Sequence, residues 1–374
     1  MSSKPGEISV TLCARPDPDT IRAWDHLVSH TPGSDVAQLS AWSAVRRQAD
    51  FVPRYVLARR AGQLVGGALV LQRRLPVLGV VGYVPHGPVI ASGAGRVAVA
   101  PVVSIALAGL GRRYLSGLFV QPPDRADDIS GHLLRLGFRP SAAGIAPAAS
   151  IRIDLTRDVE DLRNGLNSSN RRRTRTGADR GVAVRLGAER DLPVVADLLA
   201  STAAHQQFDA PSLDYLRTLY RELDRGDHVQ IFIAELGGVP VVAELFTGCG
   251  GVLTSRLTGM QRDDPVKKSG AAAAVIWSAI LWAKANGYHT FDFGGIPVDA
   301  VDMIRDGEAG HISRLAGPEV FKASFGGEPF RYPPAVELLS SRLLRTGYDL
   351  FRRSEVGGKL VATARRLMQG RASI

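Results

Sequence analysis

Arginines gather in two segments of this chain, and their chemistry points to a phosphate-bearing partner. Between Asn167 and Arg185 the one acid is Asp179, and six arginines stand there: Arg171, Arg172, Arg173, Arg175, Arg180 and Arg185. Residues 340–374 hold eight basic side chains against Asp349 and Glu355: Arg342, Arg345, Arg352, Arg353, Lys359, Arg365, Arg366 and Arg371. A guanidinium presents planar donors that fit phosphate oxygens, and the net charge of +10 favours polyanions. The alternative is a solvated helix face and a basic tail.

The cysteine content and the length of the apolar runs indicate the cellular compartment. The chain has two cysteines, Cys13 and Cys249, so neither a disulfide framework nor a thiolate zinc site is supported, and we expect no metal. The first residues contain no apolar run typical of a secretory signal. The longest apolar stretch, Val97–Gly111, has about 15 residues, short of the ~20 that cross a bilayer. We expect a cytoplasmic protein without a transmembrane segment, and contact with a membrane surface stays open.

Two segments repeat each other at a fixed offset. Residues 55–71 resemble residues 230–246, and when Ala58 is placed on Ala234, Gly62 falls on Gly238 (234 − 58 = 176). Each copy has an apolar run, a glycine turn and a second apolar run, which predicts a β-hairpin. An offset of this length suits a duplicated domain rather than a solenoid.

The remaining pattern predicts an α/β protein with mixed sheets in two domains, since 374 residues exceed the usual size of one core. Helices are expected at 18–30, 40–49, 98–112, 125–136, 157–181, 191–204, 211–225 and 266–286. Strands are expected at 53–60, 64–73, 80–84, 116–121, 149–155, 182–186, 229–236, 240–247, 251–258 and 288–293. Breakers at 138–150 and near Gly326 place a first domain at 1–148, completed by the tail 326–374, and a second at 149–325.

The duplicated hairpin resembles the central hairpin of the GNAT acyltransferase fold, and two such folds in one chain resemble the Fem family of aminoacyl-tRNA-dependent aminoacyltransferases. Several family motifs follow one another in order: Gln38-x-x-x-Trp42, Tyr83-Val84-Pro85-His86-Gly87-Pro88, Arg180-Gly181-Val182, Trp277 to Gly287, Asp292-Phe293-Gly294-Gly295-Ile296 and Phe321-Lys322-Ala323-Ser324-Phe325-Gly326-Gly327. The resemblance implies two tandem GNAT-like acyltransferase domains with mixed sheets. It also implies aminoacyl-tRNA as co-substrate, an amine acceptor and no cofactor.

The same resemblance implies roles for individual residues. Substrate contacts are expected at Arg46, Tyr83, Gln121, Tyr215, Asp292 and Phe321. Contacts with tRNA are expected at Arg171, Arg172, Arg173 and Arg175. Arg46 stands where the family has a lysine that meets a diphosphate, and it can keep that role. His86 stands in the place of a family arginine and receives no catalytic role.

Lys322 is the catalytic candidate. An aminoacyl ester is already activated, so the enzyme has to align the amine with the carbonyl and stabilise the oxyanion. The motif places the Lys322 cation beside the reacting ester. The leaving ribose hydroxyl can take the proton directly or through water, so a carboxylate base is not required.

Two departures from the family pattern leave the acceptor open. Gln121 stands where the family commonly has an acid, and an amide cannot act as a base. Pro211 replaces an arginine that contacts substrate phosphate in cell-wall members. The acceptor is therefore either a peptidoglycan precursor, lipid II-like or a UDP-linked muropeptide, or an amine-bearing natural product.

Two other function classes remain. The run Lys267-Lys268-Ser269-Gly270-Ala271-Ala272 fits the loop by which coenzyme-A-dependent GNAT enzymes bind pyrophosphate at a helix N-terminus, which would make this an acyl-CoA N-acyltransferase. A non-catalytic RNA-binding module is the third class, although the arginine cluster lacks aromatic platforms for stacking bases.

Overall fold

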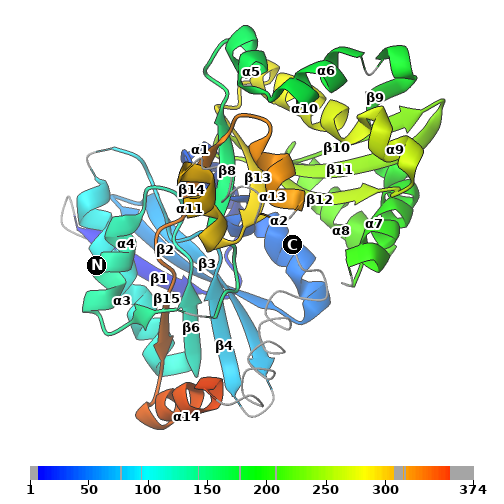
Figure 1. Cartoon of the computed structure of the whole chain (residues 1–374). Helices are drawn as coiled ribbons and strands as arrows, with labels where there is room; N and C mark the ends of the chain where they lie inside the picture. Colours follow the sequence, from blue (N-terminus) through cyan, green and yellow to red (C-terminus); the bar gives the residue numbers. More distant parts are fainter. Residues whose placement is uncertain are drawn as a thin grey trace. The chain divides into compact units, whose positions relative to one another are not determined.

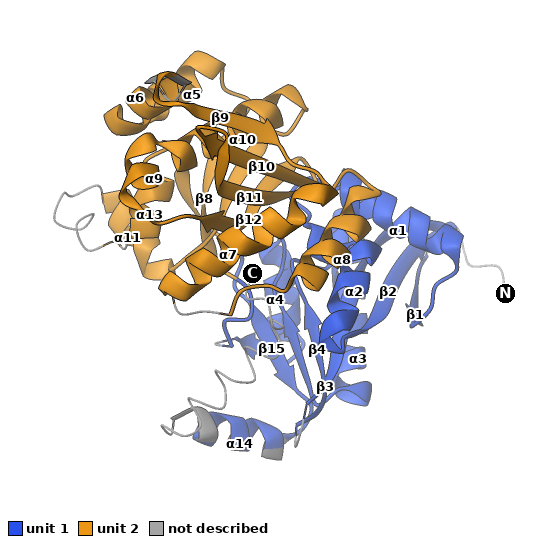
Figure 2. Ribbon diagram, turned by 90° about the vertical axis from the view of Figure 1, so that its right-hand side faces the viewer, with its two compact units in different colours: residues 1–146, 332–373 blue, residues 147–331, 374 orange. Residues whose placement is uncertain are grey.

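The computed structural model describes residues 7–75, 78–93, 95–141, 143–176, 178–206, 209–306, 315 and 317–353. The chain divides into two compact units (Figure 2). Unit 1 consists of residues 1–146 and 332–373, and unit 2 of residues 147–331. Of the basic tail, Lys359, Arg365, Arg366 and Arg371 lie outside the described residues.

Unit 1 is built on a mixed sheet, which has eight strands among the described residues (Figure 1). The order is β1-β2-β3-β4-β6-β15-β7, with β5 paired to β3. The strands are β1 (Ile8–Cys13), β2 (Val52–Arg60), β3 (Gln63–Leu75), β4 (Gly79–Val84), β5 (Val89–Ile90), β6 (Gly117–Val120), β7 (Arg139–Pro140) and β15 (Val336–Leu339). The pair β4–β6 is parallel and its neighbours in the sheet are antiparallel, as expected from the mixture of hairpins and helices.

Helices cover both faces of this sheet. They are α1 (Pro18–His30), η1 (Val36–Gln38), α2 (Ser40–Arg46), η2 (Arg47–Ala49), α3 (Arg96–Tyr114), α4 (Asp127–Arg135) and α14 (Arg342–Arg353). Successive side chains of β2 point to opposite faces. Val56 therefore joins the core that contains α3 and α4, whereas Tyr55 packs edge-on against Trp24 of α1, with ring centroids 6.1 Å apart.

Helix α3 is longer than the apolar stretch expected from the sequence. Its 19 residues make it the one helix, within the described part of the chain, that is long and apolar enough to cross a membrane by length and composition. Val103, Leu107 and Leu110 are fully buried in the core of unit 1. A core helix passes the same test of length and hydropathy, so the finding is weak evidence for a membrane span.

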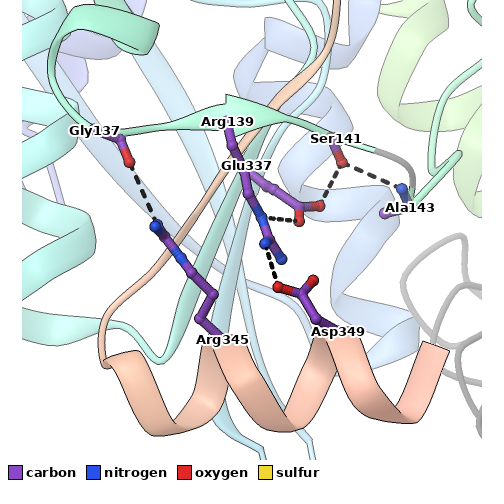
Figure 3. A network of polar contacts seen from close by, with 7 residues as sticks. All are labelled: Gly137, Arg139, Ser141, Ala143, Glu337, Arg345 and Asp349. Carbon is purple, nitrogen blue, oxygen red and sulfur yellow. Dashed lines mark hydrogen bonds and ion pairs between the residues drawn. The ribbon is translucent and has the colours of Figure 1, made fainter. Parts of the chain in front are cut away.

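The chain returns to unit 1 after residue 331 and completes the sheet there. Strand β15 lies between β6 and β7 and pairs with both. Figure 3 shows how α14 is attached beside it: Arg139 donates from Nε to Glu337 (3.0 Å) and from Nη1 to Asp349 of α14 (2.7 Å). The return begins at Tyr332 rather than at 326, because residues 328–331 form strand β14, which pairs with β8 of unit 2.

Unit 2 is built on a second mixed sheet, of order β14-β8-β13-β12-β11-β10-β9. Its strands are β8 (Ala149–Asp154), β9 (Val182–Leu186), β10 (Val229–Leu236), β11 (Val239–Cys249), β12 (Val252–Met260), β13 (Thr290–Ile296) and β14 (Glu328–Arg331). Its helices are α5 (Val159–Gly165), α6 (Ser168–Thr176), η3 (Ala178–Arg180), η4 (Glu189–Asp191), α7 (Leu192–Gln206), α8 (Leu213–Asp224), α9 (Asp264–Ser269), α10 (Ala271–Ala285), α11 (Val298–Asp306) and α13 (Gly317–Ala323). Helices α10 and α7 lie on opposite sides of this sheet (Figure 1).

Two expected helices are broken in the structure. The helix expected at 157–181 is α5, α6 and η3, because Leu166 takes an extended conformation (ψ 143°) and ends α5. The helix expected at 266–286 is α9 and α10, separated by Gly270 at φ +85°. A left-handed residue cannot continue a right-handed helix, and glycine adopts this φ without steric cost.

The repeated hairpins are alike down to their irregularities. The β2–β3 register shifts between Ala58 and Arg59, and the β10–β11 register shifts between Ala234 and Glu235. Both bulges therefore fall at the same offset as the aligned residues (234 − 58 = 176). Each turn also has two residues at positive φ, with Gly62 and Gly238 both at +81°. A bulge shared at this offset supports duplication rather than two independent hairpins.

Candidate active site

Strands β12 and β13 of unit 2 are paired only at their beginnings. Their parallel register runs from Val252–Thr290 to Thr254–Asp292, although the strands continue to Met260 and Ile296. Beyond that point Gly294, at φ +72°, takes the backbone of β13 close to β12, and a Cβ there would lie 2.8 Å from the carbonyl oxygen of Ser255. Glycine is thus required where the two strands begin to separate, and polar side chains gather around this position.

Lys322 reaches this position from α13. Its Nζ donates a hydrogen bond to the carbonyl oxygen of Gly295, at 2.8 Å, and the side chain is half-buried. Burial lowers the pKa of Lys322, while the negative charges of Glu244, Asp292 and Glu319 oppose that decrease. A partly desolvated cation interacts more strongly with a developing oxyanion than one in bulk water.

Glu244 of β11 is a buried carboxyl group that the sequence reasoning did not single out. It is 3% exposed, and its Oε1 accepts a hydrogen bond from the Ser255 hydroxyl. Burial raises the pKa of Glu244 to about 7, while hydrogen bonds and the charge of Lys322 act in the opposite direction. The signal was present in the sequence, because Glu244 is the acid within the apolar run 241–246.

Asp292 is fully buried at the point where β13 leaves β12. Its carboxylate forms an ion pair with Nε of Arg152 (2.7 Å) and accepts from the Gly294 N–H (2.8 Å) and from the Ser150 hydroxyl. The guanidinium of Arg152 also lies 3.6 Å above the ring of Phe330. These contacts give Asp292 a part in shaping the Gly294–Gly295 segment that holds Lys322, and its expected contact with substrate stays a prediction.

Aromatic rings set the position of α13. Phe321 packs edge-on against Phe325 at 5.1 Å between centroids, and Phe325 packs against Phe293 of β13 at 5.4 Å. The expected substrate contact of Phe321 is untested, but the ring lies next to Lys322 in the chain and links its helix to the core of unit 2.

The arginines of α6 project from a helix that is tied to the end of α13. Asn170, which is 2% exposed, donates from Nδ2 to the Ser324 hydroxyl (2.7 Å), and the Asn167 N–H donates to the Ser324 carbonyl (2.9 Å). Arg171, Arg172 and Arg175 are exposed. Arg173 instead packs on Gly270, where an added Cβ would lie 3.1 Å from the Cβ of Arg173. The exposed arginines and Lys322 therefore belong to one connected part of unit 2.

The other expected contact residues fall into separate places. Arg46, Tyr83 and Gln121 are all buried in unit 1, where the Arg46 guanidinium lies 4.6 Å over the Phe51 ring. Gln121 donates from Nε2 to the Pro333 carbonyl (3.0 Å) and so helps to hold the returning chain. Tyr215 is half-buried in the first turn of α8 in unit 2, and its N–H donates to the Ser212 hydroxyl at 3.2 Å. Substrate contact by these residues stays a prediction.

The loop considered for coenzyme A is partly occupied by protein groups. Residues 264–269 form α9, and the Ala271 N–H at the start of α10 donates to the Ser269 hydroxyl (3.1 Å). Arg180 donates to the Lys268 carbonyl at 3.1 Å. The Ala271 N–H in the first turn of α10 is therefore already hydrogen-bonded, and Arg173 lies against Gly270. This geometry gives little support to binding of the coenzyme-A pyrophosphate at this loop. Across the described ranges, no cluster of three or more His, Cys, Asp or Glu side chains could hold a metal ion.

The known proteins that this chain resembles are transferases. Residues 163–308 match a family model described as an acetyltransferase (GNAT) domain. Over 223 residues, which are 57% of this chain, the sequence is 22% identical to the lipid II:glycine glycyltransferase of Staphylococcus aureus (strain MRSA252). The match covers 53% of that protein, so the chain spans about half the length of this curated relative.

Solved structures extend the likeness across both units. The crystal structure of FemX has a TM-score of 0.73 at 16% identity, covering 88% of this chain and 98% of that one. The structure of L-PGS from Bacillus licheniformis has a TM-score of 0.57 at 13% identity, covering 94% and 97%. At these sequence identities the two solved structures are evidence for the fold alone. The expected α/β class with GNAT-like mixed sheets is confirmed.

Proposed function

Because the chain resembles the Fem family in sequence and in its tandem GNAT-like fold, we propose that it is an aminoacyltransferase that acts on the amine of a peptidoglycan or lipid-linked precursor. The donor in this proposal is aminoacyl-tRNA, and the product is an amide. The observation that carries the proposal is the half-buried Lys322 cation, held on the Gly295 carbonyl where β12 and β13 separate.

Lys322 supplies the charge that the reaction needs. When the acceptor amine attacks the ester carbonyl, negative charge develops on the carbonyl oxygen. A preorganised cation in a partly desolvated site stabilises that oxyanion without having to reorganise solvent. The Gly295 carbonyl and the aromatic packing of Phe321 hold the lysine in place before the reaction begins.

The exposed arginines of α6 favour a polyanionic donor. Arg171, Arg172 and Arg175 present guanidinium groups on a helix that is hydrogen-bonded to Ser324, two residues from Lys322. In the proposal, tRNA phosphates bind this helix and bring the aminoacyl end toward the lysine. We place the reaction in the cytoplasm as part of the same proposal. An amine-bearing natural product is the second class of acceptor, since Pro211 stands where cell-wall members have a phosphate-binding arginine.

The proposed function is tested by offering two donors. The protein is incubated with charged total tRNA or with acyl-CoA, together with lipid II-like, UDP-linked and small amine acceptors, and products are identified by mass spectrometry. We expect one amino-acid residue to be added from charged tRNA and nothing from uncharged tRNA. Transfer from the thioester alone would contradict the proposal.

Replacing Arg171, Arg172 and Arg175 together by glutamine should weaken tRNA binding and reduce its dependence on salt. Each lost phosphate contact lowers the slope of log K against log salt by about one unit, so a decrease of about two to three is expected. The slope is measured by filter binding over a range of salt concentrations.

The matched control replaces Arg217, Arg221 and Arg225, which are exposed on α8 or directly after it, by glutamine. This change removes the same charge and should leave most of the slope intact. If wild type and the α6 variant have equal slopes of log K against log salt, the arginines of α6 do not contact tRNA phosphates and form a solvated helix face.

A further inference from the structure

The buried Glu244 carboxyl group is hydrogen-bonded to the hydroxyl group of Ser255, which lies nearer the surface of unit 2. Glu244 is 3% exposed, whereas Ser255, which donates to its Oε1, is half-exposed. Their strands β11 and β12 are paired on either side of a register shift between Leu245 and Phe246. A buried acid with a hydroxyl between it and the surface has the arrangement of a proton relay.

Ser255 and Lys322 contact adjacent residues of β13. The Ser255 carbonyl lies against Gly294, and the Lys322 ammonium is bonded to the carbonyl of Gly295. Glu244 and Lys322 also influence each other electrostatically, since each shifts the pKa of the other toward its charged form. The relay therefore ends beside the cation to which the proposed reaction assigns the oxyanion.

We propose that Glu244, acting through the Ser255 hydroxyl, carries the proton of the transfer reaction. This inference rests on the function proposed above. The amine nitrogen bonds to the carbonyl carbon and loses a proton to Ser255 Oγ, while Ser255 passes its own proton to the Glu244 carboxylate. The bond between carbonyl carbon and ribose oxygen then breaks, and the proton returns by the same route to that oxygen. Ser255 and Glu244 end as they began, and no further reactant is consumed.

The environment of Glu244 suits both halves of this cycle. Burial raises its pKa to about 7, opposed by Ser255 and Thr258 of β12 and by Lys322 of α13. A carboxyl group with a pKa near the working pH can accept a proton and also return it. Because only the carboxylate accepts, the contribution of Glu244 should rise with pH up to about 7 and be constant above it.

The test compares single-turnover rates of aminoacyl transfer from pH ~5.5 to ~8.5, for wild type, Glu244→Gln and Ser255→Ala. The titration of the acceptor amine is common to all of them, so the ratio of wild-type to variant rate isolates Glu244. We expect this ratio to rise about tenfold per pH unit below 7 and to level off near ~10² for both variants. Thr247→Val, which alters another buried polar residue of β11, should give a constant ratio near one.

Thermal unfolding supplies a readout that does not depend on activity. Folding raises the pKa of Glu244 above its unfolded value, so the buried carboxylate destabilises the folded state as pH rises through about 7. Glu244→Gln removes that destabilisation, and its Tm relative to wild type should increase from pH ~5 to ~8. A Tm difference that does not change with pH would overturn the assignment.

The outcomes separate the relay from the proposed function. If wild type transfers from aminoacyl-tRNA but the rate ratios do not change with pH, the relay is wrong and the function stands. If wild type does not transfer from aminoacyl-tRNA, both are wrong. Should Glu244→Gln fail to fold, the Ser255→Ala ratio decides by the same criterion, because that variant keeps the buried carboxyl group.

Discussion

Lys322→Met should lower the single-turnover rate constant for aminoacyl transfer by about 10²–10³ at saturating donor, which is the scale for losing one oxyanion-stabilising donor. Methionine keeps most of the aliphatic stem, so the packing of α13 is retained while the charge and the hydrogen bond to Gly295 are lost. Rapid-quench measurement with aminoacyl-tRNA gives the rate constant, and donor affinity is measured separately by filter binding.

Lys284→Met is the matched control. Lys284 is also half-buried in unit 2, and its Nζ also donates to a backbone carbonyl, that of Leu155, at 2.9 Å. This variant should transfer within about twofold of wild type, and Gln121→Ala should cost little, because an amide accepts no proton. A wild-type rate for Lys322→Met would remove its assigned role, and the site would have to be sought elsewhere.

Arg152→Met should lower the free energy of unfolding of unit 2 by about 3–5 kcal/mol, because it leaves the buried Asp292 carboxylate without its charged partner. The side chain of Asp292 is 1% exposed and that of Arg152 is 12% exposed, so water cannot replace the lost ion pair. The contact with the Phe330 ring is lost as well. Native-state hydrogen exchange of peptides that span β8 and β13 measures the loss.

Two further variants test the cause of that destabilisation. Combining Arg152→Met with Asp292→Asn should restore part of the lost stability, since no uncompensated charge remains. Arg331→Met breaks the ion pair with Asp302, in which the side chain of Arg331 is 43% exposed and that of Asp302 is 64% exposed. This variant should lower the free energy of unfolding by at most about 1 kcal/mol. A cost for Arg152→Met as small as that of Arg331→Met would mean that the buried pair contributes little.

Local patterns in the sequence determined the repeated hairpins and most of the strands around them. A hairpin depends on residues that are near one another in the chain, so its turn glycine and apolar runs are sufficient to predict it. The two turns and the two bulges then agree at one offset, which the sequence alignment had already placed at Ala58 and Ala234. Lys322 and the arginines of α6 could also be identified as candidate site residues from the sequence, because the order of motifs and the distribution of charge can be read without a structure.

Contacts between distant residues were decided only by the tertiary structure. The sequence offered Gln121 and no base, whereas the fold brings the buried Glu244 and Ser255 to the place where Lys322 is held. Asp292 was visible as part of a motif, but its partners Ser150 and Arg152 lie about 140 residues away in the chain. No local pattern encodes such a pairing.

The boundaries of the helices and strands also depended on tertiary contacts that the sequence did not reveal. The helices expected at 157–181 and 266–286 are each broken in the structure. The first ends where Leu166 enters the core, and the second is interrupted at Gly270, against which Arg173 packs. Strand β15 completes the sheet of unit 1 although nearly 200 residues separate it from β7. Propensity and periodicity act within one element, so the sequence alone determined many of the segments that form helices and strands, but not β1, β14, β15, α11, α13 or α14. Burial and long-range hydrogen bonds, which exist only when the sheets have formed, decided where they end and which side chains meet.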